Sequence, residues 1–173
     1  MVRLKRSLLA LLAAATMASC SSGPHGTPAS TGSDTPGGTV VTVSEVTDGD
    51  TFHASYLGKE ERVRLIGVNT PEVPWYGGKG ECYGVEAGLY ARSRLDGEAV
   101  QLEFDQGLRD RYGRILAYVY VGDELFNLTL VSLGYATADP VPPDTRMAAE
   151  FSSAEAQAKA AGLGLWSACP PGR

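Results

Sequence analysis

Hydrophobic and polar positions alternate along three neighbouring stretches in the first half of the chain. Residues 39–47 (TVVTVSEVT), 51–57 (TFHASYL) and 60–68 (ERVRLIGVN) are rich in Val, Ile, Thr and aromatic side chains, the residue types that favour strands. The polar segments DGD and GKE that separate them are typical of turns. The pattern therefore predicts a three-stranded meander.

The third of these strands ends in an unusual polar corner. Side chains alternate between the two faces of a strand, so Arg64 is expected on the same face as Ile66 and Val68, and Leu65 on the opposite face with Asn69. An arginine on a face that is otherwise apolar needs an anionic partner.

The remaining pattern predicts more helices than strands. A helix is expected over residues 83–95, strands over 98–105 and 114–121, and helices over 125–133 and 145–161, the last two followed by glycines. Three strands, a helix, two strands and then helices is the element order of a small OB-type barrel. We therefore expect an α+β fold that is mainly a β barrel: a five-stranded OB-fold barrel with three packed helices. An unrelated α+β sandwich is the alternative.

The first residues have the composition of an export signal. A basic start is followed by an apolar run over residues 8–15, which is too short to cross a bilayer permanently. Residues 17–20, Met-Ala-Ser-Cys, resemble the lipobox of bacterial lipoproteins. Residues 1–19 would then be a signal peptide and Cys20 the lipidated first residue, which predicts an extracytoplasmic protein anchored to the cell membrane by lipid. The alternative is an ordinary cleaved signal with an incidental cysteine.

The following segment separates this terminus from one folded domain. In residues 21–38, 15 of 18 residues are Gly, Pro, Ser or Thr, so residues 20–38 are expected to be a flexible linker. Residues 39–169 are long enough for one domain with its own core, and residues 170–173 are a tail. We expect a monomer.

Charge restricts the possible partners. The chain has 15 Lys and Arg against 20 Asp and Glu, and removing the three basic residues of the signal leaves 12 against 20, a net charge of −8. This charge argues against a protein that coats nucleic acid generally, and any site for a polyanion must be local.

The cysteines can be divided by their expected roles. If Cys20 carries lipid, Cys82 and Cys169 remain, an even number in an oxidising compartment. We expect them to form a disulfide, with two buried free thiols as the alternative.

Three polar clusters carry candidate chemistry. The first, residues 48–51 (DGDT), could simply be a hairpin turn. The second contains Arg64, Asn69, Thr70 and Glu72, and the third is the basic loop at residues 109–114 (RDRYGR), whose alternative role is a solvated loop. A further polar stretch, residues 139–144, is expected to be only a rigid connection.

Together the three clusters have the parts for phosphodiester hydrolysis. The side chains of Asp50 and Asn69 and the Thr70 carbonyl are hard oxygen donors that suit calcium. Two arginines can fork onto phosphate oxygens, and Glu72 can take a proton from water. The chain has no Cys-His metal set, no G-x-S-x-G and no P-loop, so other hydrolase and kinase chemistries lack their residues.

The chain from about Val40 to Trp166 resembles the staphylococcal nuclease (thermonuclease) family. The motif DGDT corresponds to residues 48–51, and R-L-x-x-V-[DN]-T-P-E to residues 64–72. A YGPEA-like motif corresponds to residues 83–87, and FDxGxRxDxYGR to residues 104–114. Several motifs in the right order are more specific than any one of them.

The resemblance implies a fold, an activity and a set of residues. The family fold is an OB barrel with three helices, and its activity is calcium-dependent cleavage of DNA and RNA at the 5′ P–O bond, leaving 3′-phosphate ends. By this resemblance Asp50, Asn69 and the Thr70 carbonyl are calcium ligands, with Asp48 behind them. The other roles fall to phosphate-binding Arg64 and Arg114, the general base Glu72, and Tyr112 beside the phosphate or nucleotide.

Two departures from the family qualify these expectations. Asn69 replaces an Asp ligand, so calcium is expected to bind more weakly. Pro140 and Pro142 replace the tyrosines that flank the base, so base stacking is weaker or supplied elsewhere. Two other functions stay open: an OB-fold lipoprotein that binds single-stranded nucleic acid without cutting it, and a structural envelope lipoprotein. A pure binder would not need Glu72 together with Asp50 and the two arginines.

Overall fold

The structure is a computed structural model that describes residues 38–75 and 77–170. The predicted signal peptide, the lipidation site at Cys20 and nearly all of the linker lie outside these residues. Within them, no helix combines the length and the apolar character needed to cross a membrane.

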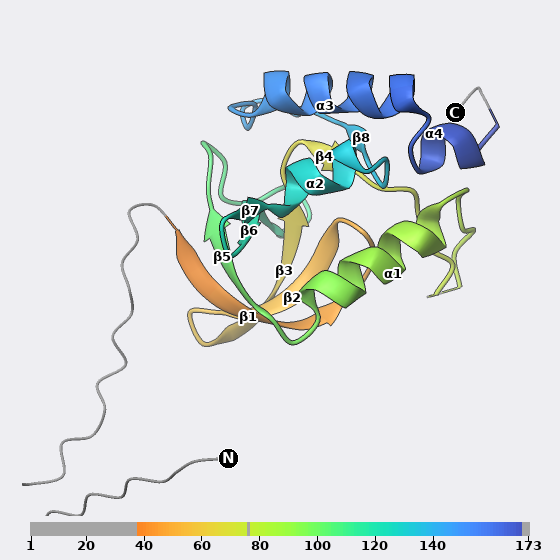
Figure 1. Cartoon of the computed structure of the whole chain (residues 1–173). Coiled ribbons are helices and arrows are strands. Elements are labelled where there is room, and N and C mark those ends of the chain that lie inside the picture. The colour runs from red at the N-terminus through yellow and green to blue at the C-terminus, as the bar shows by residue number, and fades with distance from the viewer. Residues whose placement is uncertain (1–37, 76, 171–173) are drawn as a thin grey trace, which may run out of the picture. The chain divides into compact units, whose positions relative to one another are not determined.

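Five strands close into a barrel (Figure 1). They are β1 (Thr39–Val46), β2 (Thr51–Tyr56), β3 (Lys59–Leu65), β5 (Ala99–Glu103) and β6 (Ile115–Val121). Neighbouring strands pair antiparallel in the order β3-β2-β1-β5-β6, and the barrel closes where β3 and β6 pair in parallel, with Val63 opposite Ile115. The two-residue β7 (Glu124–Leu125) pairs antiparallel with the end of β6. The expected five-stranded OB-type barrel is confirmed.

The strand pattern explains which side chains fill the barrel. In β1, Val41 and Val43 are buried at alternate positions, and a bulge between Val43 and Glu45 shifts the alternation so that Val46 also points inward. Phe52 of β2 is completely buried among them. The apolar positions of the alternating segments thus form one continuous core.

Helices cover the barrel from two sides (Figure 1). α1 (Gly84–Leu95) packs against β1, and α2 (Phe126–Ser132) lies between β6 and α3 (Ala148–Ala161). A short α4 (Leu165–Ala168) follows α3. The three expected helices are present, although α3 begins three residues later than predicted, and α4 was not predicted.

The polar corner after β3 differs from the prediction. The expected strand over residues 60–68 stops at Leu65, the chain turns at Ile66 and Gly67, and a separate β4 (Val68–Asn69) pairs with β8 (Thr137–Ala138). Gly67 has φ +76°, and a Cβ there would lie 2.4 Å from a ring carbon of Phe151 in α3. Only glycine suits this position. The predicted alternation of faces is therefore wrong beyond Leu65.

The two cysteines of the domain are joined. Cys82 and Cys169 form a disulfide with 5.8 Å between their Cα atoms. It links the segment just before α1 to the residue that follows α4.

Candidate active site

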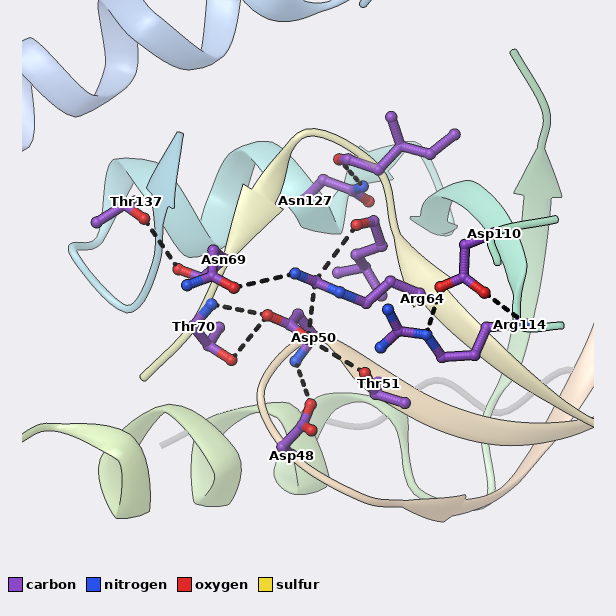
Figure 2. Close-up of polar contacts among 12 residues, drawn as sticks. Asp48, Asp50, Thr51, Arg64, Asn69, Thr70, Asp110, Arg114, Asn127 and Thr137 are labelled. Atoms are coloured by element: carbon purple, nitrogen blue, oxygen red, sulfur yellow. Dashed lines mark hydrogen bonds and ion pairs between the residues drawn. The ribbon is translucent and has the colours of Figure 1, made fainter. Parts of the chain in front are cut away.

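Asp50 is the best-anchored acidic side chain of the site (Figure 2). It precedes β2 directly and is buried. Its Oδ1 atom lies 2.7 Å from Nη1 of Arg64 and accepts a hydrogen bond from the Thr51 hydroxyl at 3.2 Å. Its Oδ2 atom accepts two hydrogen bonds from Thr70, from the backbone N–H at 2.7 Å and from the hydroxyl at 3.0 Å. Since both oxygens have partners, the carboxylate is held in one orientation.

Gly49 in the DGD turn makes the contact between Thr70 and Asp50 possible. A Cβ at Gly49 would lie 2.6 Å from the side chain of Thr70, so any larger residue would push Thr70 away from Asp50. The turn is therefore more than a hairpin connection, because it lets the segment after β4 approach the start of β2.

Arg64 connects Asp50 to the corner beyond β3. The pairing of β2 with β3 places Arg64 opposite Thr51, one residue from Asp50. Nη2 of Arg64 donates to Oδ1 of Asn69 at 3.1 Å, while Nη1 is on Asp50 (Figure 2). The guanidinium of Arg64 thus bridges Oδ1 of Asp50 and Oδ1 of Asn69, the two side-chain oxygens that the sequence predicted to bind a cation.

Asp48 lies behind Asp50 rather than beside Arg64. Its Oδ1 accepts the backbone N–H of Asp50 at 3.0 Å. Burial, followed by the negative charge of Asp50, raises the pKa of Asp48 to about 7. Asp48 therefore supports the backbone at Asp50 and carries less negative charge at neutral pH than an ordinary aspartate.

A buried asparagine fixes the turn that brings Asn69 back to Arg64. Nδ2 of Asn127 in α2 donates to the carbonyl oxygens of Ile66 at 2.9 Å and Ala117 at 3.3 Å, and its Oδ1 accepts the N–H of Val119 at 2.9 Å. Asn127 is fully buried. It ties the turn after β3 to β6, and sequence reasoning missed it, although one asparagine in the apolar helix FNLTLVS was a signal.

The basic loop before β6 supplies the second arginine. Arg114 lines the same cleft as Arg64, a depression of about 560 Å³. Asp110 holds Nε of Arg114 at 2.7 Å and accepts the backbone N–H groups of Tyr112 and Arg114. With Nε occupied, the two terminal nitrogens of Arg114 make no hydrogen bond within the described residues and are available to an anion in the cleft.

Tyr112 stands at the rim of this cleft. It is 61% exposed, and its hydroxyl accepts a hydrogen bond from Arg111 at 2.6 Å. The segment at residues 141–144 lines the cleft as well and includes Pro142. Asp144 is buried there and accepts the N–H of Gly107 at 2.6 Å, so this segment, expected to be only a rigid connection, also anchors the start of the basic loop.

Glu72 is set apart from this cluster. Its backbone is held by Glu81, whose N–H donates to the Glu72 carbonyl at 2.9 Å and whose Oε2 accepts the Glu72 N–H at 3.2 Å. The Glu72 side chain is exposed, and its carboxylate has no hydrogen bond or ion pair with residues 38–75 or 77–170. The structure therefore leaves Glu72 free for solvent and does not bring it into contact with Asp50, Arg64 or Arg114.

Comparison with known proteins identifies the family. Residues 62–168 match the family model described as staphylococcal nuclease homologue. The chain is 40% identical over 124 residues to the thermonuclease of Staphylococcus intermedius, an alignment that covers 72% of this chain and 74% of that protein. The chain belongs to the staphylococcal nuclease family. It is also 38% identical over 129 residues to endonuclease YncB of Bacillus subtilis (strain 168), covering 73% of this chain and 61% of that protein.

One segment departs from the family pattern in length. Residues 104–114 are one residue shorter than the FDxGxRxDxYGR pattern of the staphylococcal nuclease family, so Asp110 follows Arg109 directly. Arg109 pairs with both carboxylate oxygens of Glu61 at 2.9 Å and donates to the Gly113 carbonyl at 2.7 Å. The shorter loop is thus fastened to β3 at one end and by Asp110 at the other.

The oxygen donors of this family member suit a hard cation such as calcium. Oδ1 of Asp50 and Oδ1 of Asn69 already face one positive group, the Arg64 guanidinium, and calcium accepts mixed carboxylate and amide oxygens. No group of three or more His, Cys, Asp or Glu side chains converges among the described residues, so the site offers one buried carboxylate and neutral oxygens. The donors fit calcium in kind, and a cation bound between them would compete with Arg64 for both oxygens.

Proposed function

We propose that this protein is a calcium-dependent nuclease that hydrolyses DNA and RNA at the 5′ P–O bond and leaves 3′-phosphate ends. The observation that carries the proposal is that Arg64 and Arg114, from β3 and the loop before β6, line one cleft beside the buried carboxylate of Asp50. The names of the relatives, thermonuclease and endonuclease, support the same class of activity.

In this proposal each group has one task. Arg64 and Arg114 fork onto the non-bridging oxygens of the scissile phosphate and stabilise the charge that develops there. Glu72, whose carboxylate has no hydrogen bond or ion pair with the described residues, takes the proton of the attacking water. Asp50, Asn69 and the Thr70 carbonyl would hold calcium, which, when bound, offsets phosphate charge as a Lewis acid.

Position in the cell is part of the proposal. The basic start, the short apolar run and the Met-Ala-Ser-Cys sequence at residues 17–20 support export and lipid attachment at Cys20. Metabolic labelling with a radioactive fatty acid should mark the wild-type protein and leave Cys20→Ser unlabelled; label on both proteins would refute the assignment of Cys20.

The nuclease proposal is tested with fluorogenic DNA and RNA oligonucleotides. Wild-type protein should cleave both in calcium and neither in chelator, and Glu72→Gln should lower turnover by roughly 10²- to 10⁴-fold, the usual worth of a general base. Glu98→Gln, which changes another exposed glutamate, is the control. Full activity in chelator or in Glu72→Gln would overturn the proposal, and binding without cleavage in every condition would indicate a binding module.

A further inference from the structure

Arg62 lies next to the site on an outward face of the barrel. Val63 and Leu65 of β3 are buried, so Arg62 and Arg64 occupy successive outward positions of the same strand. β3 pairs in parallel with β6, with Val63 opposite Ile115. The same register continued back by one residue brings Arg114 alongside Arg62.

The guanidinium of Arg62 has no partner among residues 38–75 and 77–170. It is exposed and makes no hydrogen bond or ion pair within the described part of the chain. The arginines around it differ: Arg64 is held by Asp50, Arg109 by Glu61, and Nε of Arg114 by Asp110. Arg62 therefore keeps all its donors for a ligand.

A groove connects Arg62 to the cleft. Arg62, Tyr112 and Arg114 line a shallow groove of about 180 Å³. Tyr112 and Arg114 also line the larger cleft, so the two depressions share a wall. An extended ligand in the cleft can continue into the groove without leaving basic and aromatic side chains.

We propose that Arg62 forms a second phosphate subsite, which binds the phosphate next to the scissile one on a single-stranded polynucleotide. This inference rests on the proposed nuclease function. Arg64 and Arg114 hold the scissile phosphate, and the exposed ring of Tyr112 stacks on the nucleotide between the two phosphates. The guanidinium of Arg62 then binds the next phosphate through two parallel hydrogen bonds.

Acidic groups limit this subsite to one phosphate. Glu60 is the preceding outward position of β3; its carboxylate accepts the Ser44 hydroxyl and lies 4.0 Å from His53. Cross-strand pairing places His53 beside Arg62 and Glu45 beside His53. Since carboxylates repel phosphate, the basic path ends at Arg62. The protein should therefore favour oligonucleotides over a dinucleoside monophosphate, which has a single phosphate.

The test measures binding and its salt dependence. Glu72→Gln protein, with and without Arg62→Ala, is titrated in calcium against a fluorescent single-stranded octamer and a dinucleoside monophosphate, by anisotropy, between about 50 and 200 mM salt. Arg62→Ala should weaken octamer binding several-fold, with a much smaller change for the dinucleoside monophosphate. It should also make the slope of log K against log salt less negative by about 0.7. In otherwise wild-type protein, the same substitution should raise KM for the octamer more than it lowers kcat.

Two controls separate a contact from general electrostatics. Lys59→Ala removes the same charge from an exposed position on the same strand, outside the groove, and Arg62→Lys keeps the charge without the fork. Arg62→Ala is expected to lose more octamer affinity than Lys59→Ala, with Arg62→Lys intermediate. Equal losses and equal slopes for Arg62→Ala and Lys59→Ala would overturn the subsite and leave the nuclease proposal standing, provided that wild-type protein cleaves the octamer. A wild-type protein that neither binds nor cleaves it would overturn both.

Discussion

Nη1 of Arg64 lies 2.7 Å from Oδ1 of Asp50. Both side chains are largely buried, with 13% and 7% of their surfaces exposed, and Nη2 of the same guanidinium is on Asn69. A cation that binds Asp50 and Asn69 therefore competes with Arg64 for the same oxygens. A displaced Arg64 would be free to turn to a phosphate in the cleft that it already lines, and cation binding would then be coupled to the capture of substrate.

The first prediction concerns this competition. Arg64→Gln should bind calcium at least as tightly as wild type, because no guanidinium then offsets the charge of Asp50. Turnover should nevertheless fall by about 10²-fold or more, the usual loss when a preorganised donor to the transition state is removed. Calorimetry with calcium alone and steady-state kinetics measure the two effects separately.

Arg94→Gln is the matched control for Arg64→Gln, because Arg94 is also a paired arginine but its partner, Glu124, is outside the cleft. Weaker calcium binding in Arg64→Gln would contradict the competition. An unchanged kcat with a raised KM would show that Arg64 serves only to bind substrate.

The barrel was predictable from sequence because its signals are local. In β1 and β2 the buried positions follow directly from local runs of Val, Thr and Phe. Likewise, the glycine that ends α3 comes directly after the last helical residue. The turn at Gly67 was not predictable in this way. It depends on Phe151, which is far along the sequence in α3 and packs where a side chain of residue 67 would be.

The same turn explains what the sequence could not say about the site. The motifs identified Asp50, Arg64, Asn69 and Thr70, and the structure brings these four residues together. Strand alternation put Arg64 and Asn69 on opposite faces, yet they share a hydrogen bond because the chain turns between them. Motifs indicate which residues meet, whereas the choice of hydrogen-bond partners depends on the folded geometry of distant segments.

The second prediction concerns Asn127, which joins the turn to the barrel. Asn127→Ala leaves the Ile66 carbonyl, the Ala117 carbonyl and the Val119 N–H without their side-chain partner. The Ala117 carbonyl keeps the backbone N–H of Ile66 as a donor at 2.9 Å, so two groups are left unsatisfied. Unsatisfied buried groups cost about 1–3 kcal/mol each, and the free energy of unfolding should therefore fall by roughly 3 kcal/mol after partial relaxation.

Urea denaturation of Asn127→Ala measures this loss, and Ser132→Ala, an exposed change at the end of the same helix, is the control. A loss no larger than in Ser132→Ala would mean that the three hydrogen bonds do not stabilise the fold.

The third prediction concerns the disulfide. Cys82 and Cys169 are separated by 87 positions, and opening a loop of that length should lower the free energy of unfolding by about 3–5 kcal/mol in the chain-entropy model. The double variant Cys82→Ser with Cys169→Ser should therefore unfold at lower urea concentration than the oxidised wild type.

Wild-type protein that has been reduced and alkylated should lose stability to a similar extent, and this separates loss of the bond from the serine substitutions themselves. Intact-mass measurement of the exported protein should show two hydrogens fewer than the reduced chain; two free thiols would contradict the pairing.

The last prediction concerns Asn69, whose Oδ1 accepts a hydrogen bond from Arg64 at 3.1 Å. Asn69→Asp adds a negative charge beside Asp50, which attracts a doubly charged calcium ion more strongly than the singly charged guanidinium. Calcium should bind more tightly, and half-maximal activity should need less of it. Turnover at saturating calcium should fall, because the new carboxylate repels the phosphate.

Gln157→Glu is the matched control, since it adds the same charge at an exposed position of α3. Calorimetry gives the calcium affinity of each variant, and activity measured over a calcium series gives the half-maximal concentration. If Asn69→Asp binds calcium no more tightly than Gln157→Glu, the extra carboxylate does not reach the ion. Asn69 would then be only the partner of Arg64, and Asp50 and Thr70 would have to hold calcium without it.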